Sequence, residues 1–197
     1  MAMSGGLRGV GTGAGEGLAG WRRRLGVGAL GLVVAVAVLA GWRLPAAWAQ
    51  DELFVANFNG NSVTVYSRSA SGNTAPLRTL SGAATGLNGP RNVALDLTNN
   101  ELFVVNQSTP SVTVYSLTAS GNTAPLRTLS GAATGLDGPI GVALDLTNNE
   151  LFVANGTPSV TVYSRTASGN TAPLRTLSGA ATGLNVPLGV ALDLTNN

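Results

Sequence analysis

The chain of 197 residues contains no cysteine, no histidine and no lysine. The absence of cysteine excludes a disulfide framework and thiolate chemistry. The absence of histidine removes the commonest general base and metal ligand of enzymes. Arginine is therefore the only cationic side chain at neutral pH. The positions of the arginines show which part of the chain carries the positive charge.

Five of the 11 arginines precede residue 50, so the formal charge of +2 comes from the N-terminal segment. From residue 50 onward, six arginines face eight aspartates and glutamates, which gives a net charge of −2. A mildly acidic body without lysine is a poor match for a phosphate backbone. The composition therefore predicts no nucleic-acid partner.

Residues 1–49 have the organisation of a secretory signal peptide. Arg22–Arg24 form a basic region, Leu25–Ala40 is an apolar run of 16 residues, and Ala47 and Ala49 fit a cleavage site. We therefore expect a mature protein that begins near Gln50 and is secreted or periplasmic. An uncleaved anchor helix and export by a twin-arginine signal are the alternatives, whereas a bacterial lipid anchor is excluded because no cysteine follows the apolar run.

One stretch of the remaining sequence is written three times, in residues 52–100, 101–149 and 150–197. The first two copies differ at 10 of 49 positions and are identical at the other 39. Such a period indicates a repeat architecture, in which one unit cannot bury its apolar face alone and packs on its neighbours. Function must therefore be sought in the assembled array.

Each unit contains four short segments with strand patterns. In SVTVYS the valines alternate with threonine and tyrosine, a period of two. The Asn-Asn pair before each ELFV segment favours a two-residue hairpin turn, because asparagine tolerates positive φ. The expected strands are Val93–Leu97, Val142–Leu146 and Val190–Leu194 (VALDL); Glu52–Ala56, Glu101–Val105 and Glu150–Ala154 (ELFV); Ser62–Ser67, Ser111–Ser116 and Ser159–Ser164 (SVTVYS); and Leu77–Leu80, Leu126–Leu129 and Leu174–Leu177 (LRTL).

Four antiparallel strands in each unit predict the blades of a β-propeller. A two-sheet sandwich needs about seven strands per unit, and a single-turn solenoid repeat is about half as long as this one. No helical periodicity follows residue 50. We therefore expect an all-β fold in which residues 50–197 form about three propeller blades, an incomplete ring as a single chain.

The sequence from Gly89 onward resembles the NHL repeat. It has a Gly-Pro pair, an apolar strand that ends in aspartate, a polar turn, and an apolar Phe-Val strand that ends in asparagine; Gly138-Pro139, Asp145 and Phe152–Asn155 repeat this pattern. The resemblance covers nearly all of residues 51–197. It implies the six-bladed propeller superfamily, which also holds gluconolactonase-like and virginiamycin-lyase-like enzymes. It is specific for fold and weak for function, and the small number of units departs from the family pattern.

Three polar positions recur in every unit, and structural roles are favoured for all of them. The aspartates could form a carboxylate ring that holds a cation, but hydrogen bonds to their own turns are favoured, because a site needs asymmetry. The asparagines are expected to form turns rather than ligand contacts, and the arginines to form ion pairs or a solvated strand rather than anion sites. The recurring residues are Asp96, Asp145 and Asp193; Asn57, Asn106 and Asn155; and Arg78, Arg127 and Arg175.

Catalysis has little support in the sequence. No histidine can activate a serine, and the enzymes implied by the resemblance use either a histidine or a metal held by carboxylates and asparagine. Glu52, Glu101 and Glu150 occupy the same repeat position, so no glutamate is singled out as a ligand. We expect no catalytic residue, no metal site and no cofactor.

The positions at which the first two units differ point to one face. Eight of the ten differences fall where ELFV segments end, SVTVYS segments begin, LRTL segments end and VALDL segments begin, and only Arg68 and Ser69 lie elsewhere. Loops on one face of a rigid scaffold commonly carry binding specificity, although neutral drift at exposed loops would give the same pattern. The candidate ligand-binding residues are Phe58, Asn59, Asn61, Arg91, Asn92, Gln107, Asp137 and Ile140.

These features favour a secreted or periplasmic, non-catalytic binding or scaffold module that engages a protein, peptide or glycan through this face. Phe58 is the expected anchor, because aromatic residues and arginine dominate binding hot spots. The alternative is a fragment of a metal-dependent lactonase-like or lyase-like propeller enzyme, whose catalytic residues would lie in further blades.

Three blades alone leave a closure problem. Closed propellers have about four to eight blades, and an open array exposes sheet edges. A head-to-tail homodimer, in which each copy donates Val190–Leu194 to the first blade of the other, would make six blades. Further blades missing from this sequence are the other solution, which the abrupt stop after Leu-Asp-Leu-Thr-Asn-Asn slightly favours.

Overall fold

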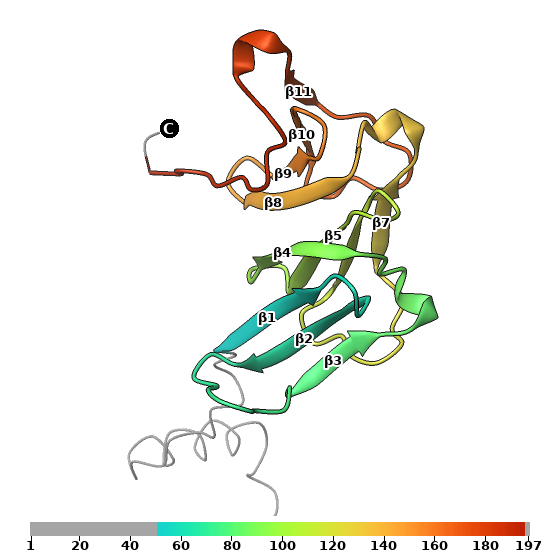
Figure 1. The fold of residues 1–197 in the computed structure, drawn as a ribbon, viewed down its shortest axis with the longest axis vertical. Coiled ribbons are helices and arrows are strands. Elements are labelled where there is room, and N and C mark those ends of the chain that lie inside the picture. The colour runs from blue at the N-terminus through green and yellow to red at the C-terminus, as the bar shows by residue number, and fades with distance from the viewer. Residues whose placement is uncertain (1–50, 196–197) are drawn as a thin grey trace, which may run out of the picture. The chain divides into compact units, whose positions relative to one another are not determined.

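The computed structural model describes residues 51–195, and the predicted signal peptide lies outside these described residues. They form eleven strands, and one 3-10 turn follows the last strand of each of the three sheets (Figure 1). None of the described residues belongs to a helix long and apolar enough to cross a membrane. The strands are β1 (Glu52–Asn57), β2 (Ser62–Ser67), β3 (Arg78–Ser81), β4 (Pro90–Asp96), β5 (Glu101–Asn106), β6 (Ser111–Ser116), β7 (Arg127–Ser130), β8 (Pro139–Asp145), β9 (Glu150–Asn155), β10 (Ser159–Ser164) and β11 (Arg175–Ser178). The turns are η1 (Ala83–Thr85), η2 (Ala132–Thr134) and η3 (Ala180–Thr182).

The strands form three antiparallel sheets in chain order: β1-β2-β3, β4-β5-β6-β7 and β8-β9-β10-β11. We call these sheets blade 1, blade 2 and blade 3. Within the described residues, no named strand of one blade pairs with a named strand of another, and blade 1 has three strands. The predicted all-β fold of about three propeller blades in an open arrangement is therefore confirmed (Figure 1).

The VALDL strands differ most from the prediction. In blades 2 and 3 these strands begin at Pro90 and Pro139, three residues earlier than expected, because a β-bulge follows each proline and hides the start of the strand in the sequence. The third expected strand, Val190–Leu194, is wrong: these residues are not in a strand. A strand needs a partner for its backbone hydrogen bonds, and β4 and β8 find theirs in the strand that follows each of them.

The turn before each ELFV strand is also longer than expected. Leu97–Asn100 separates β4 from β5, and only Asn100 takes a positive φ, of 57°. The expected two-residue hairpin is therefore replaced by a four-residue loop. Asp96 closes this loop, because its carboxylate accepts hydrogen bonds from the backbone N–H and the side-chain amide of Asn99, at 2.9 and 2.8 Å.

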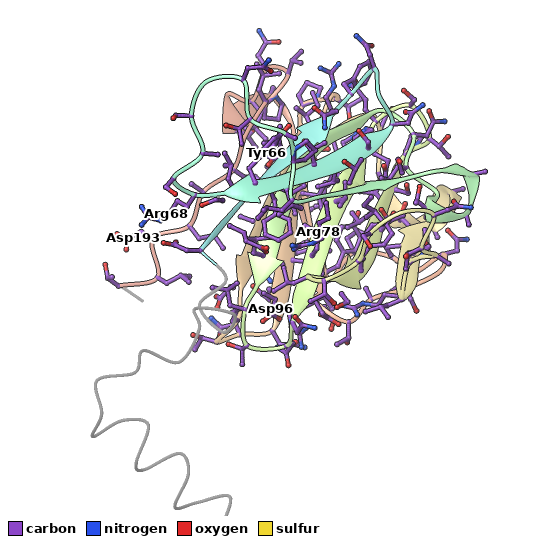
Figure 2. The ribbon with its side chains drawn as sticks, turned by 90° about the horizontal axis from the view of Figure 1, so that it is seen from below. Tyr66, Arg68, Arg78, Asp96 and Asp193 are labelled. Atoms are coloured by element: carbon purple, nitrogen blue, oxygen red, sulfur yellow. The ribbon has the colours of Figure 1, made fainter. Side chains whose placement is uncertain are left out.

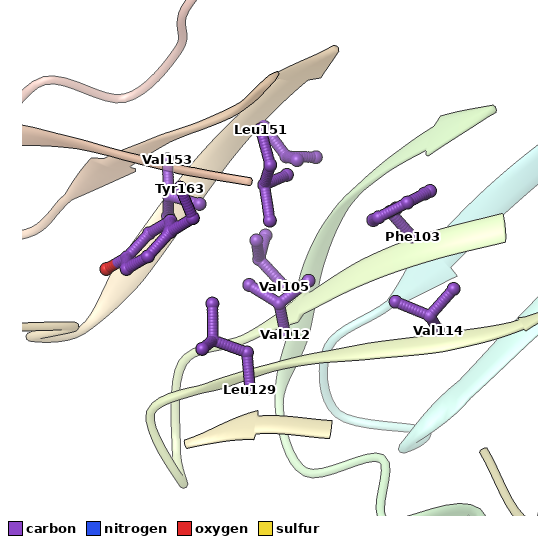
Figure 3. Packing of buried hydrophobic residues seen from close by; sticks show 9 residues of the cluster. Phe103, Val105, Val112, Val114, Leu129, Leu151, Val153 and Tyr163 are labelled. Carbon is purple, nitrogen blue, oxygen red and sulfur yellow. The ribbon is translucent and has the colours of Figure 1, made fainter. Parts of the chain in front are cut away.

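Alternation along each strand builds a separate core between neighbouring blades. In β5, Leu102 faces blade 1 and packs with Val63 and Leu80, whereas Phe103 faces blade 3 and packs with Leu151 and Tyr163. Figure 3 shows the second of these cores. Each unit thus buries its apolar residues against its neighbours, as a repeat architecture requires.

Two kinds of hydrogen bond join one blade to the next. The Tyr115 Oη atom donates to the Thr85 carbonyl at 2.5 Å, and Tyr163 repeats this bond to Thr134 at 2.6 Å. Burial raises the pKa of Tyr115 to about 12, so its hydroxyl stays protonated as a donor.

The loop between β6 and β7 supplies the second link. Gly121 exchanges backbone hydrogen bonds with Ser81 and Thr79 of β3, at 2.9 and 2.7 Å, and the Asn122 Oδ1 atom accepts the N–H of Ala84 at 2.7 Å. The corresponding loop of blade 3 repeats these contacts on β7. These contacts explain why the sequence of this loop, between the SVTVYS and LRTL strands, hardly varies between units although the loop is exposed.

Candidate ligand-binding face

The predicted binding residues lie in three kinds of connecting segment. Phe58, Asn59 and Asn61 form the turn between β1 and β2, and Gln107 directly follows β5. The others lie at the start of the VALDL strands or just before them: Arg91, Asn92, Asp137 and Ile140.

The structure brings Phe58, Arg91 and Gln107 together, and we call these three residues the Arg91 cluster. The Arg91 guanidinium carbon lies 4.1 Å from the centre of the Phe58 ring, within the range of a cation–π contact. The Arg91 Nε atom donates to the Gln107 side-chain carbonyl at 2.7 Å. Arg91 is exposed, while Phe58 and Gln107 are half-buried beside it. The cluster therefore fixes an exposed cation across blades 1 and 2.

Gly89 gives the cluster room to form. It has a positive φ of 61°, and a Cβ atom at this position would lie 2.8 Å from the Phe58 ring and 2.3 Å from the Ser108 hydroxyl. Only glycine meets both conditions without strain. Sequence reasoning did not select Gly89 or Ser108, although Ser108 occupies one of the ten variable repeat positions, that of Asn59.

Asn61 and Asn92 support the backbone of this face. Asn61 takes a positive φ of 44°, and its side-chain carbonyl accepts the N–H of Gly89 at 2.8 Å. The Asn92 side-chain carbonyl accepts the N–H of Val93 at 2.7 Å, at the bulge of β4. Asn59 is exposed in the turn between β1 and β2, next to Phe58. Asn61 and Asn92 therefore hold the loops, and Arg91 projects from them.

Asp137 and Ile140 extend the face toward blade 3. A Cβ atom at Gly138 would lie 3.8 Å from the Gln107 amide nitrogen, so Gln107 connects the Arg91 cluster to the residue next to Asp137. Ile140 stands at the repeat position of Arg91 and is half-buried. Asp137 is exposed and makes no side-chain hydrogen bond or ion pair within residues 51–195. An arginine and an aspartate thus stand on one continuous face.

The recurring asparagines have a different role from the expected one. Asn106 and Asn155 are fully buried rather than turn-forming. The Asn106 amide nitrogen donates to the Thr113 hydroxyl at 3.0 Å, and its carbonyl accepts the N–H of Asn88 at 3.2 Å. These asparagines clamp the strand end to the neighbouring strand and to the incoming loop. Their periodic recurrence in the sequence does not distinguish such a clamp from a turn.

The recurring aspartates and arginines have the structural roles that the sequence favours. Asp145 closes its own loop through Asn148, as Asp96 does through Asn99, and these hydrogen bonds hold the pKa of Asp145 below its usual value. Each recurring arginine forms a bidentate ion pair with the glutamate that begins the ELFV strand of the same blade. The pairs are Arg78–Glu52, Arg127–Glu101 and Arg175–Glu150.

The ion pairs between blades 2 and 3 form a network. Glu101 accepts from Arg127 at 2.5 and 2.8 Å and from Arg165 at 2.7 Å, and Arg165 also pairs with Asp96 at 3.0 Å. The hydrogen bonds from Arg127 hold the pKa of Glu101 below its usual value, against the effect of burial, and the charge of Arg165 adds to them. Residues 51–195 contain no group of three acidic, histidine or cysteine side chains that could hold a metal ion.

The family comparison agrees with this fold. Residues 52–186 match the family model described as "Lactonase, 7-bladed beta-propeller". No curated protein matches the chain. A solved structure described as the WD40 β-propeller domain of Doa1 is similar at 12% identity and a TM-score of 0.49, over 68% of this chain. The present chain spans 38% of that structure's length.

The family match extends over more than half of the sequence. It supports the β-propeller part of the expected resemblance and does not single out the NHL repeat. The chain belongs to the lactonase, seven-bladed β-propeller family.

Proposed function

We propose that this chain is a secreted or periplasmic binding module that holds an acidic peptide segment of a protein ligand on the face of the Arg91 cluster. The observation that carries the proposal is the exposed Arg91, stacked on Phe58 and oriented by Gln107. The hydrogen bond to Gln107 uses only the Nε atom of Arg91. The two terminal nitrogens of Arg91 can then bind a carboxylate in the bidentate geometry that arginine favours.

The neighbouring residues fit a peptide better than a lone anion. Phe58 offers apolar contact area at the centre of the face, and aromatic residues with arginine are the commonest binding anchors. Asp137, beyond Gln107, gives the face a negative group at its other end. A ligand that pairs its own carboxylate with Arg91 and a cationic group with Asp137 would lie across blades 2 and 3.

Replacing Arg91 with isoleucine, the residue of the corresponding position 140, is expected to abolish binding of an acidic peptide such as hexaglutamate. Arg91→Lys keeps the charge but loses the planar fork, so we expect about tenfold weaker binding, or more, than for the wild-type protein. Isothermal titration at low salt, with hexalysine as the control peptide, measures both effects. Equal affinity of wild-type and Arg91→Ile protein for hexaglutamate would contradict the proposal.

The proposed secretion depends on residues outside the described part of the chain. The small residues Ala47 and Ala49 predict cleavage that leaves Gln50 at or near the new N-terminus. N-terminal sequencing of exported protein tests this prediction, and exported protein that retains Leu25–Ala40 would exclude cleavage.

The family match favours a second candidate function, the hydrolysis of a lactone. The described residues do not fit a metal site, because Glu52, Glu101 and Glu150 are each engaged by an arginine and no three ligating side chains gather. We therefore assign no catalytic residue. Proton release from a simple lactone, followed at constant pH, tests this function independently of peptide binding. The NHL-like nature of the units likewise stays a proposal.

A further inference from the structure

Three asparagines of the chain are followed directly by glycine: Asn59, Asn88 and Asn155. Asparagine is a chemically labile residue, because the nitrogen of the next residue can attack the carbonyl carbon of its side chain. Glycine has no Cβ atom that would hinder this approach. The reaction requires a side chain and an N–H group that are both free to move, so the hydrogen bonds of the three pairs distinguish them.

The Asn88–Gly89 pair is held by side chains of two neighbouring loops. The Asn88 amide nitrogen donates to the Thr109 hydroxyl at 2.8 Å. The Gly89 N–H donates to the Asn61 side-chain carbonyl, also at 2.8 Å, and Gly89 is buried. The two groups that would react are therefore both occupied.

The Asn155–Gly156 pair is held inside the molecule. Asn155 is fully buried, and its amide nitrogen donates to the Thr161 hydroxyl at 3.2 Å. The Gly156 N–H donates to the Gly138 carbonyl at 2.9 Å. The Asn155 side chain is thus fixed toward the neighbouring strand and cannot turn toward the nitrogen that follows it.

The Asn59–Gly60 pair is free at both groups. Both residues are exposed in the turn between β1 and β2. Within residues 51–195, the Asn59 side chain makes no hydrogen bond, and the Gly60 N–H donates none. Of the three pairs, this one alone combines the reactive sequence with groups that can move, and it belongs to the candidate ligand-binding face.

We propose that Asn59 is a site of spontaneous deamidation. The Gly60 nitrogen forms a bond to the side-chain carbonyl carbon of Asn59, the bond from this carbon to the amide nitrogen breaks, and ammonia leaves with the proton that the Gly60 nitrogen gives up. Water then opens the cyclic imide at one of its two carbonyl carbons. The products are aspartate and isoaspartate, each with a carboxylate in place of the neutral amide.

The hairpin confines the structural change to its turn. β1 and β2 pair along the whole length of both strands. Beyond the other end of the strands, Arg68 and Asp51 form an ion pair at 2.6 Å, and Figure 2 shows Arg68 at this edge of blade 1. Isoaspartate lengthens the main chain by a methylene group, and this extra length has to be taken up between Phe58 and Asn61.

The effect on binding rests on the proposed function, in which Arg91 binds the carboxylates of an acidic peptide. Asn59 directly follows Phe58, whose ring centre lies 4.1 Å from the Arg91 guanidinium carbon. A carboxylate at position 59 places a negative charge beside the site of the ligand's own carboxylates, and like charges repel. A displaced Phe58 ring also loses its contact with Arg91. Both products therefore lower the affinity for an acidic ligand, so the face loses binding strength as the protein ages.

Mass spectrometry of the full chain, incubated at mildly alkaline pH and then cut with trypsin, tests the modification. We expect Asn59 to gain the mass of an amide exchanged for a carboxyl group before Asn88 or Asn155 does. The gain should be faster at higher pH, because the attacking Gly60 nitrogen has to lose its proton. No gain at Asn59, or an earlier gain at Asn88 or Asn155, would overturn the proposed site.

Gly60→Thr is the matched control, because it keeps Asn59 and copies Thr109 of the second unit. A Cβ atom at position 60 would lie 3.3 Å from the Ser62 hydroxyl, which can turn aside, and circular dichroism confirms that the variant is folded. The β-branched side chain hinders the attack, so this variant should lose the mass gain at Asn59. An equal gain in the wild-type and Gly60→Thr proteins would show that the attack of the following nitrogen is not the route.

Isothermal titration with hexaglutamate at low salt measures the effect on binding. Aged wild-type protein and Asn59→Asp protein are expected to bind about tenfold more weakly, or more, than fresh wild-type protein. Aged Gly60→Thr protein should bind as well as fresh Gly60→Thr protein. Equal affinities of fresh and aged wild-type protein would overturn the effect on binding. Fresh wild-type protein that does not bind hexaglutamate would overturn the proposed function together with this effect, whereas the mass gain at Asn59 is read independently of any ligand.

Discussion

Replacing Glu101 with glutamine is expected to lower the free energy of unfolding by about 3 kcal/mol, the lower end of the range for breaking a buried ion pair. The Glu101 side chain is 13% exposed and holds the guanidinium groups of Arg127 and Arg165 together. Glutamine has a similar size but no charge, so both arginines would keep a desolvated charge that only Asp96 partly balances. Urea denaturation of the full chain at pH 7 and a fixed protein concentration measures the change.

Glu150→Gln is the matched control for this variant. Glu150 stands at the same repeat position and pairs with Arg175, but the Arg175 side chain is 54% exposed to water. A pair of this kind contributes about 1 kcal/mol or less, because water and salt screen it. Equal losses for Glu101→Gln and Glu150→Gln would show that the network around Arg165 adds no stability.

The effect of Glu101 should also depend on pH. Because the folded state lowers the pKa of Glu101 below its ordinary value of 4.5, the stabilisation is present above that value and is lost as the pH falls below it. Asp96 acts in the same direction: burial opposes the shift, but the hydrogen bonds of Asn99 and the charge of Arg165 outweigh it and lower its pKa. The difference between wild-type and Glu101→Gln protein should therefore shrink between pH 6 and pH 3.

Most of the fold could be predicted because its determinants are local. The SVTVYS strands have the predicted bounds, since valine alternation and the flanking turn residues fix them within one unit. The failure at Val190–Leu194 has the opposite cause. Its residues Val-Ala-Leu-Asp also occur in β4 and β8, but those two strands pair with the strand that follows each of them, and no strand follows Val190–Leu194 within the described residues.

The face could be located from the sequence, but the contacts in it could not. Differences between units identified Phe58, Arg91 and Gln107, because a repeat that must pack on itself leaves only its free loops to vary. The stacking of Arg91 on Phe58 depends on the space at Gly89, which is a three-dimensional property. The clamp made by Asn106 likewise depends on a loop that arrives from 18 residues away.

Residues at the same repeat position can differ in burial, and the sequence of one unit does not predict this difference. Phe103 and Phe152 lie in almost the same sequence, and each lies under an arginine, at 5.3 and 5.4 Å from its guanidinium carbon. Phe103 is nevertheless fully buried between two blades, whereas Phe152 lines a hollow of blade 3 together with Val162 and Leu177. What separates the two rings is the neighbouring blade alone.

Replacing Phe103 with alanine is therefore expected to cost about 3–5 kcal/mol of unfolding free energy, since it opens a cavity in the core between blades 2 and 3. Phe152→Ala should cost about 1 kcal/mol in the single chain, because water already reaches that ring. Both substitutions remove an equivalent contact between the ring and an arginine, so the difference between the two losses isolates burial. Thermal or urea unfolding at low protein concentration measures both values. Equal losses for the two variants would show that burial of the Phe103 ring between the blades adds no stability.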